Sequence, residues 1–372
     1  MDHDDFTDFD RSPVRRLIDS AVRSKPEYEL RKMLALHKSE SLKKLARTYR
    51  MKRYASSKKS EMIDYLYTEV ADHDSVEAIL LHTDDEEYAF FESAAIAGGA
   101  VMSAPEAAGK PYSIFRHLYF LDIYYTSGKI TFVVPAEIRE IYLNLKSTSF
   151  PSTRKRYSMI NSLATAFVTL YGMVDFDYFI DLCNDLLSVE MDYSKLANIL
   201  FGFSWIRDIC YCLFGPDLIH AKIDEHTVET EIDENVVEAS NDEVDRIDTA
   251  RGTIPMKQLP LEEVLMYSNP SYFEHTPAHD RLIHFLEKHD PETRQFPVLP
   301  QYILGKLNEI FMQNDDTAFE DAAFDLPFID TRNFASDSEI MKMYYDLMRD
   351  VERHTRKWSL NGWMLAEIES HE

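Results

Sequence analysis

Apolar side chains recur three and four positions apart along most of this 372-residue chain, which is the spacing of one face of an α-helix. Leu30, Met33, Leu34 and His37 form an early example. We expect this helix to begin near Pro26, because proline fits the first helical turn, where its missing N–H costs nothing. The same spacing in later segments predicts a mainly helical protein.

Two shorter helices are predicted next, separated by a joint. The first covers residues 42–49, and its apolar face is so narrow that it must pack on neighbouring elements. Residues 51–55 break the helical spacing and predict an extended joint. Ser56 or Ser57 then offers an N-cap for the second helix, because a serine hydroxyl can accept a hydrogen bond from a free backbone N–H.

Two β-rich runs predict a hairpin within an otherwise helical stretch. The runs cover residues 123–125 and 130–134, and a turn that contains Gly128 joins them. A helix over residues 112–121 precedes the hairpin, and Pro135 opens another helix after it. Helices followed by a hairpin are typical of a winged helix, so a winged-helix-like unit is expected here.

Another pair of helices is predicted over residues 159–190. Its first helix ends at Gly172, and Asp175 caps the second. This layout is similar to a helix-turn-helix, but the second helix carries four acidic residues and no basic one. Because carboxylates repel phosphate, we do not expect this helix to read DNA. Residues 196–213 are strongly apolar and should lie in the core.

Five segments are predicted from these patterns and from further helical spacing after residue 256. They are an N-terminal tail at 1–25, a helical module at 26–72, the winged-helix-like unit at 75–148, a helical unit at 155–255 that follows a basic linker and contains an acidic insertion at 223–248, and a C-terminal helical domain at 256–372. Within the insertion, residues 226–239 alternate with a period of two, which suggests a short exposed hairpin or strand.

The formal net charge of −25 argues against a nucleic-acid partner when the chain is taken as a whole. The charge is unevenly distributed, however. Residues 11–63 hold sixteen Lys and Arg against five Asp and Glu, whereas residues 1–10 hold five Asp and no base. The insertion at 223–248 holds eleven acidic residues and one Arg. The chain is therefore a basic module attached to an acidic body, and only the module is a candidate for binding nucleic acid.

Two motifs of the basic module resemble a known family. Residues 42–46 read LKKLA, and residues 59–63, after an extended turn, read KSEMI. This pair is similar to the LKxLA and KxELI motifs in the N-terminal domain of transcription termination factor Rho, a relative of the SAP fold. The resemblance covers about 30 residues and implies a helix–extension–helix module of the kind that binds nucleic acid in bacterial proteins. Met51-Lys52-Arg53 stands where the family often has a glycine.

Two other stretches resemble bacterial proteins that carry the same module. Residues 133–142, VVPAEIREIY, are similar to the end of the winged-helix-like units of those proteins. The C-terminal TRKWSLNGWMLAEI resembles a TRxWxxxGxxxxEL tail, to which we match Arg356, Trp358, Gly362 and Trp363, with Ile368 in place of the final leucine. The tail implies ancestry rather than a mechanism.

The candidate nucleic-acid site is the dense run of basic residues, interleaved with two tyrosines, around the joint. Lysine and arginine can neutralise phosphates and release counterions, and the helix N-terminus near Lys58 adds oriented backbone N–H groups. The expected contact residues are Lys43, Lys44, Arg47, Tyr49, Arg50, Lys52, Arg53, Tyr54, Lys58 and Lys59. The alternative is that this basic face is only solvated, or docks on acidic protein, including the acidic body of the same chain.

No sequence feature indicates catalysis, a cofactor or a metal ion. The common nucleotide-binding, metalloprotease and serine-hydrolase motifs are absent. Four histidines invite a metal hypothesis, but Pro277 separates the first pair and spacings of five turn the later side chains to different helix faces. These histidines are His275, His279, His284 and His289. We therefore expect a protein that is not an enzyme.

The cysteine count and the hydropathy pattern favour the cytoplasm. Three cysteines cannot form a disulfide framework or a four-cysteine zinc site, which fits a reducing compartment. Cys210 and Cys212 are predicted in an apolar helix, where they would be buried structural residues with thiols pointing apart. No apolar run is long enough to span a bilayer, and the N-terminal MDHDD is unlike a signal peptide.

The sequence thus predicts a cytoplasmic, non-enzymatic protein, related to transcription or RNA, that binds the phosphate backbone of DNA or RNA through residues 26–72. A protein partner is expected on its acidic body. The alternative function is a protein-interaction adaptor whose basic module docks on acidic protein surfaces.

Overall fold

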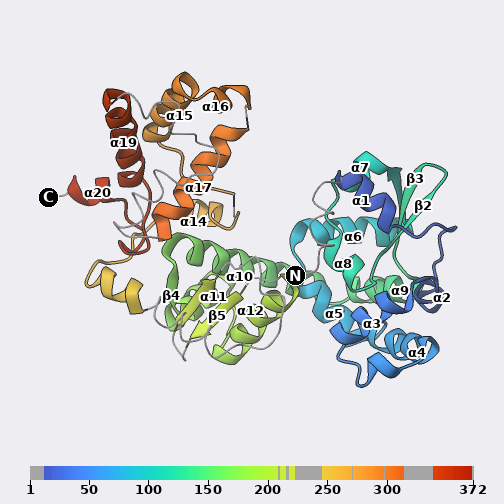
Figure 1. The fold of residues 1–372 in the computed structure, drawn as a ribbon. Coiled ribbons are helices and arrows are strands. Elements are labelled where there is room, and N and C mark those ends of the chain that lie inside the picture. The colour runs from blue at the N-terminus through green and yellow to red at the C-terminus, as the bar shows by residue number, and fades with distance from the viewer. Residues whose placement is uncertain are drawn as a thin grey trace. The chain divides into compact units, whose positions relative to one another are not determined.

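The computed structural model describes residues 12–207, 210–214, 218–222, 245–269, 271–296, 298–313 and 338–370. These residues form two units (Figure 1). Unit 1 holds the described residues up to 159 together with 201–207, and unit 2 holds the rest. Each unit is mainly helical and, in its described part, contains one antiparallel sheet of three strands. At this level the predicted fold class, mainly α with small β-hairpins, is confirmed.

Unit 1 consists of short helices around its sheet. Its helices are α1 (Pro13–Ser20), α2 (Leu30–Leu36), α3 (Ser39–Thr48), the 3₁₀-helix η2 (Tyr54–Ser56), α4 (Lys59–Val70), α5 (His73–His82), α6 (Asp85–Ala97), α7 (Ala104–Ala108), α8 (Ser113–His117), α9 (Ala136–Lys146) and the first part of α10 (Phe150–Tyr171). Its strands are β1 (Ala100–Ser103), β2 (Asp122–Thr126) and β3 (Lys129–Val133).

The first predicted helical face is present, but α2 begins at Leu30 rather than near Pro26. Leu30, Met33 and Leu34 are buried, as their spacing predicts. The backbone N–H of Leu30 donates to the Glu137 carboxylate at 3.0 Å. The start of α2 is therefore capped by a side chain of α9, which local sequence cannot reveal.

The start of α4 also differs from the expectation of a serine cap. The hydroxyl groups of Ser56 and Ser57 both donate to the carbonyl oxygen of Arg53 at 3.1 Å. Both serines therefore stabilise the turn before α4, and the helix begins at Lys59.

β2 and β3 form the predicted hairpin. Its turn residues, Ser127 and Gly128, have φ angles of 53° and 80°, and a turn with two positive φ angles matches the twist of the paired strands. β1 pairs with the other edge of β3, which gives the strand order β1-β3-β2. β1 has only four residues, too few for periodicity to predict it.

The helix before the hairpin, α8, ends at His117 and is shorter than the predicted range of 112–121. Tyr119 has a positive φ of 61°, and the N–H of Phe120 donates to the carbonyl oxygen of Phe115 at 2.8 Å. This is the hydrogen bond that commonly closes a helix C-terminus. The residues after it are then free to enter β2.

One hydrophobic core runs through unit 1. It contains buried residues from Leu17 in α1 to Phe150 at the start of α10, and it includes residues from α2, α3, α4, the sheet and α9. Residues 12–25, predicted as part of a tail, therefore contribute to the same core as the segments 26–72 and 75–148.

The basic linker predicted after residue 150 is wrong, because these residues form the first turns of α10. The Arg154 side chain is buried, and its guanidinium donates to the Thr83 carbonyl oxygen and to the Asp85 carboxylate. A basic residue that finds partners across a packed helix cannot be distinguished from a solvated one by sequence alone.

Unit 2 holds the second sheet and the C-terminal helices. Its elements are the end of α10, β4 (Met173–Asp175), α11 (Phe176–Leu187), α12 (Tyr193–Arg207, of which 201–207 belong to unit 1), β5 (Cys210–Phe214), β6 (Leu218–Lys222), α14 (Leu261–Met266), α15 (Pro277–His289), α16 (Pro291–Gln295), α17 (Leu299–Gln313), α19 (Ser338–Arg353) and α20 (Leu365–Glu369). The sheet has the strand order β4-β6-β5.

Two local signals in unit 2 are confirmed. Gly172 follows α10 with a φ of 80°, and the Asp175 carboxylate caps α11 by accepting from the Tyr178 N–H at 2.7 Å. The prediction that Cys210 and Cys212 lie in a helix is wrong, because both are in β5. A short apolar run is compatible with either element, and here pairing with β6 selects the strand. The predicted strand at 226–239 lies outside the described residues.

The C-terminal tail is a structural part of unit 2. The Trp358 indole N–H donates to the carbonyl oxygen of Thr169 at 2.9 Å. Arg356 is buried, and its guanidinium pairs with Glu274 at 2.7 Å and with Glu367 at 3.3 Å. The residues that carry the tail resemblance therefore link distant segments of this unit.

Candidate nucleic-acid interface

The predicted site residues lie in the second half of α3, in the turn that follows it and at the first residue of α4, which together we call the basic joint (residues 43–59). Arg50, two residues after the end of α3, has a φ of 55°, and the Met51 N–H donates to the carbonyl oxygen of Ala46 at 2.8 Å. This arrangement is a Schellman motif, in which glycine usually holds the position of Arg50. Arg53 is also left-handed, with a φ of 60°.

The two left-handed arginines explain how the joint turns without a glycine. A left-handed residue with a side chain costs roughly 1–2 kcal/mol relative to glycine. The joint therefore holds Arg50 and Arg53 at a conformational cost. The same backbone conformation occurs at Tyr119 and Ser127, where it closes a helix and forms a hairpin turn, so by itself it indicates a turn rather than a function.

Most of the predicted contact residues are exposed. The exposed ones are Lys44, Arg47, Arg50, Lys52, Arg53 and Lys58, and the partly buried ones are Lys43, Tyr49, Tyr54 and Lys59. The joint thus brings six exposed cationic side chains together within fifteen consecutive residues, from 44 to 58.

Five of these cations form no ion pair with any acidic side chain in the described part of the chain: Lys44, Arg50, Lys52, Arg53 and Lys58. This contrasts with the neighbouring cations of the same module. Arg31 pairs with Asp64 and Lys32 pairs with Glu29. Within the described residues, the positive charge of these five side chains is therefore not neutralised by a neighbouring carboxylate.

Two predicted contact lysines are instead engaged within the unit. The Lys43 ammonium lies 3.2 Å from the Glu40 carboxylate. The Lys59 ammonium donates to the carbonyl oxygen of Ala35 at 2.7 Å, which ties the start of α4 to α2. Lys59 therefore contributes to the fold, and its charge also lies at the edge of the joint.

The two tyrosines of the joint differ in their surroundings. The Tyr49 hydroxyl donates to the carbonyl oxygen of Leu118 at 3.3 Å, and the Tyr49 carbonyl oxygen accepts from Tyr65 at 2.9 Å. Burial raises the pKa of the Tyr49 phenol. Tyr49 thus fastens the joint to the residues after α8. The Tyr54 ring is also partly buried and packs against the hydrophobic core of unit 1.

Backbone donors add to the positive potential of the joint. The N-terminus of α4 directs the first free N–H groups of a twelve-residue helix toward this surface. One of the nearby donors is already satisfied, because the Lys58 N–H donates to the Glu61 carboxylate at 3.0 Å. The remaining N–H groups of the first turn supplement the side-chain cations.

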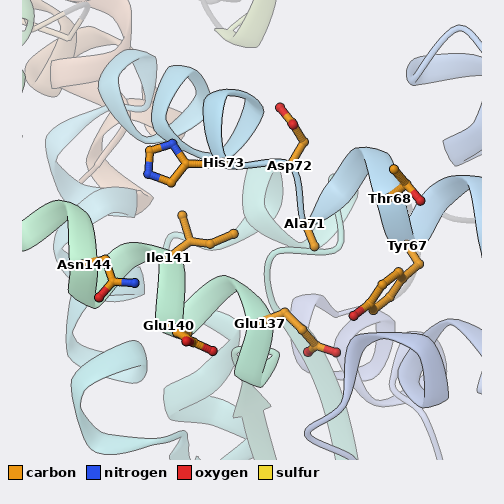
Figure 2. A pocket seen from close by; sticks show the side chains of 9 residues that line it. All are labelled: Tyr67, Thr68, Ala71, Asp72, His73, Glu137, Glu140, Ile141 and Asn144. Carbon is orange, nitrogen blue, oxygen red and sulfur yellow. The ribbon is translucent and has the colours of Figure 1, made fainter.

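The opposite end of α4 is acidic. A cavity of about 500 Å³ lies there. Figure 2 shows Asp72 and His73 on one side of it and Glu137 and Glu140 of α9 on the other. A helix of twelve residues is about 18 Å long. The cations of the joint and the carboxylates around the cavity are therefore separated by about the length of α4, and the carboxylates would repel phosphate. The positive surface of the module therefore lies at one end of α4 and the acidic surface at the other.

The hairpin region supplies few additional cations. Arg116 donates to the hydroxyl and carbonyl oxygens of Ser20, and Arg139 donates to the carbonyl oxygens of Ala95 and Ile96. Both arginines therefore satisfy backbone groups within unit 1. The sequence could not distinguish them from phosphate contacts, because their partners are distant in the chain.

No group of three or more His, Cys, Asp or Glu residues suited to a metal ion occurs among the described residues. His279 is fully buried, and its Nδ1 accepts a hydrogen bond from the Thr276 N–H at 3.1 Å. Desolvation by this burial lowers the pKa of His279 to about 4. The imidazole is therefore neutral at pH 7 and serves the core of unit 2.

Comparison of the chain with protein-family models, with curated proteins and with solved structures finds no match. Among the helices that the structure describes, none is long and apolar enough to cross a membrane. The geometry and charge of the joint are therefore the observations that bear on function.

Proposed function

We propose that unit 1 binds nucleic acid through the phosphate backbone at the basic joint, and that the protein is not an enzyme. The observation that carries this proposal is the group of five exposed cations without an acidic partner among the described residues, Lys44, Arg50, Lys52, Arg53 and Lys58. The helix, turn and helix of α3, the joint and α4 are consistent with the Rho-like helix–extension–helix module inferred from the sequence.

A winged helix is the second part of the proposal. The order α6, β1, α7, α8, β2, β3 and the strand order β1-β3-β2 are consistent with a winged helix and support this part of the proposal. In such a fold α8 would take the place of the recognition helix. Its Arg116 is committed to Ser20, however, so we assign α8 a supporting role and place the nucleic acid on the joint.

The chemistry of the joint favours backbone binding over sequence readout. Its cations can neutralise phosphates, which carry no sequence information. If five cations each contact a phosphate of duplex DNA, the logarithm of the association constant should fall with the logarithm of salt concentration with a slope of about −4.5. We therefore expect weak sequence preference and strong salt dependence.

The proposal is tested by fluorescence anisotropy on single- and double-stranded DNA and RNA over a range of salt concentrations. The test variant replaces Lys44, Arg50, Lys52, Arg53 and Lys58 with Gln. The control variant makes the same change in charge away from the joint, replacing Arg15, Arg16, Lys25, Lys110 and Lys129 with Gln. Equal losses in the two variants, or no loss in the first, would contradict the assignment of the joint.

The adaptor function remains the second candidate, because residues 223–248 carry eleven acidic residues and can compete for the same cations. A variant in which only residues 223–248 are deleted distinguishes nucleic-acid binding from the adaptor function. If the acidic segment masks the joint, its removal raises nucleic-acid affinity. If the joint docks only on acidic protein, neither the intact nor the shortened protein binds nucleic acid.

A further inference from the structure

Helices α6, α9 and α10 border a second cavity of unit 1, with a volume of about 300 Å³. Its charged lining comes from Asp85 and Glu92 of α6, Lys146 of α9, and Arg154 and Lys155 of α10. No residue of the basic joint lines it. The cavity is therefore a feature separate from the proposed nucleic-acid site.

Arg154 is incompletely satisfied beside this cavity. Its side chain is only 5% exposed, and its Nη2 donates to the Thr83 carbonyl oxygen at 2.5 Å and to the Asp85 carboxylate at 2.8 Å. The Tyr88 ring lies 4.8 Å from the guanidinium carbon. Nε and Nη1 are buried and have no acceptor among the described residues. Buried donors of this kind are rare in folded proteins and call for a water molecule or an ion.

The charges around the cavity favour an anion over water. Asp85 is engaged by Arg154 and Ser158, and Glu92 is engaged by Lys146 at 2.7 Å. Lys155 is exposed and forms no ion pair with an acidic side chain that the structure describes. The lining therefore holds three cations against two carboxylates. One positive charge of the lining, on the exposed Lys155, therefore has no carboxylate opposite it.

We propose that this cavity binds an oxyanion of the phosphate class, with Arg154 and Lys155 as its principal ligands. A guanidinium forms strong charge-assisted hydrogen bonds with phosphate oxygens, and an ammonium group supplies a point charge. The volume lies at the lower end of the range for small-molecule pockets, so it accommodates free phosphate or a small phosphate monoester.

The proposal is tested on the full-length protein by calorimetric titration and by thermal unfolding. Inorganic phosphate and glycerol 3-phosphate are compared with sodium chloride at equal ionic strength. We expect both phosphates to raise the unfolding temperature above the value in chloride, because a ligand that binds only the folded state stabilises it. Tighter binding of the monoester would identify a phosphorylated metabolite, whereas tighter binding of phosphate would identify the free ion.

Substitutions locate the binding. Lys155→Gln should weaken phosphate binding roughly tenfold, because it removes one charge-assisted hydrogen bond. Arg154→Lys should abolish it, and if that variant does not fold, Lys155→Gln decides. Lys110→Gln is the control, because Lys110 does not line the cavity. Equal stabilisation by chloride, or wild-type phosphate affinity in Lys155→Gln, would overturn the proposal. The cation replacements in the basic joint should leave the Lys155-dependent phosphate binding unchanged.

Discussion

The indole ring of Trp358 packs directly on the α-carbon of Gly172. A β-carbon added to Gly172 would lie 2.5 Å from Cδ2 of that ring, and Gly172 also has a φ of 80°. The Trp358 ring is held in place because its N–H donates to the Thr169 carbonyl oxygen and the Trp358 carbonyl oxygen accepts from Arg251 at 2.9 Å. The end of α10 and the C-terminal tail therefore depend on glycine at this contact.

We expect Gly172→Ala to lower the free energy of unfolding by about 2–4 kcal/mol, since it combines left-handed strain with overpacking. Gly252→Ala is a matched control, because Gly252 has a φ of 52° but nothing within 4 Å of an added β-carbon. The control should lose only about 1–2 kcal/mol. Urea unfolding followed by tryptophan fluorescence measures both, and equal losses would show that the ring contact contributes nothing.

Arg50→Gly should separate stability from binding. Glycine relieves the left-handed strain at this position, so the free energy of unfolding should rise by about 1 kcal/mol. The same change removes a cation of the joint, so nucleic-acid affinity should fall. Arg47→Gly, within α3, is the control and should lower both quantities, because glycine destabilises a helix by about 1 kcal/mol. A loss of stability in Arg50→Gly would contradict the strain argument.

The two tyrosines of the joint should respond differently to substitution. Tyr49→Phe removes the hydrogen bond to Leu118 and should cost about 1 kcal/mol of stability without changing affinity for single-stranded nucleic acid. Tyr54→Ala should lower that affinity roughly tenfold, because base stacking on an aromatic ring is lost. Anisotropy titrations and urea unfolding of both variants give the result. The opposite pattern would mean that Tyr49 is the stacking residue.

His279 should make unit 2 sensitive to acid. Desolvation lowers its pKa from 6.5 to about 4, and the charges of His275 and His354 act in the same direction. The unfolded state binds a proton more readily than the folded state, so this contribution is complete above pH 6.5 and is lost as the pH falls toward 4. Between pH 7 and pH 5 the loss is about 2 kcal/mol.

The comparison of wild type with His279→Gln isolates this effect, because the other titrating groups are common to both. Urea unfolding at pH 7 and pH 5 should show a smaller pH dependence in the variant, and an NMR titration of the imidazole should give a midpoint near pH 4. An identical pH dependence in both proteins would exclude His279 as the cause.

Much of the candidate site was predictable from the sequence. The concentration of cations at residues 43–59 and the break between two helices are both local properties, and both are present in the structure. The individual roles were not predictable. Lys59 binds the carbonyl oxygen of Ala35 and Tyr49 binds that of Leu118, which are 24 and 69 residues away. Such partners are set by packing rather than by spacing.

The surroundings of Arg154 could not be predicted from the sequence. In the sequence, Arg154 belongs to a basic run that indicates a linker. In the structure it lies in α10 and its side chain is buried against α6, with Nε and Nη1 unsatisfied. The oxyanion proposal arises from this burial. No pattern of neighbouring residues distinguishes a guanidinium in solvent from one that packs on a tyrosine ring.

The sequence by itself determined the mainly helical character, the hairpin around Gly128 and the charge difference between the basic module and the rest of the chain. These features follow from hydrophobic periodicity, turn residues and charged residues, which are local properties of the sequence. Only the tertiary structure decided that α1 to α9 share one core, that Cys210 lies in a strand, and which cations keep their charge free of an acidic partner within the described residues. These outcomes depend on hydrogen bonds and packing between residues far apart in the chain, so they exist only once the chain has folded.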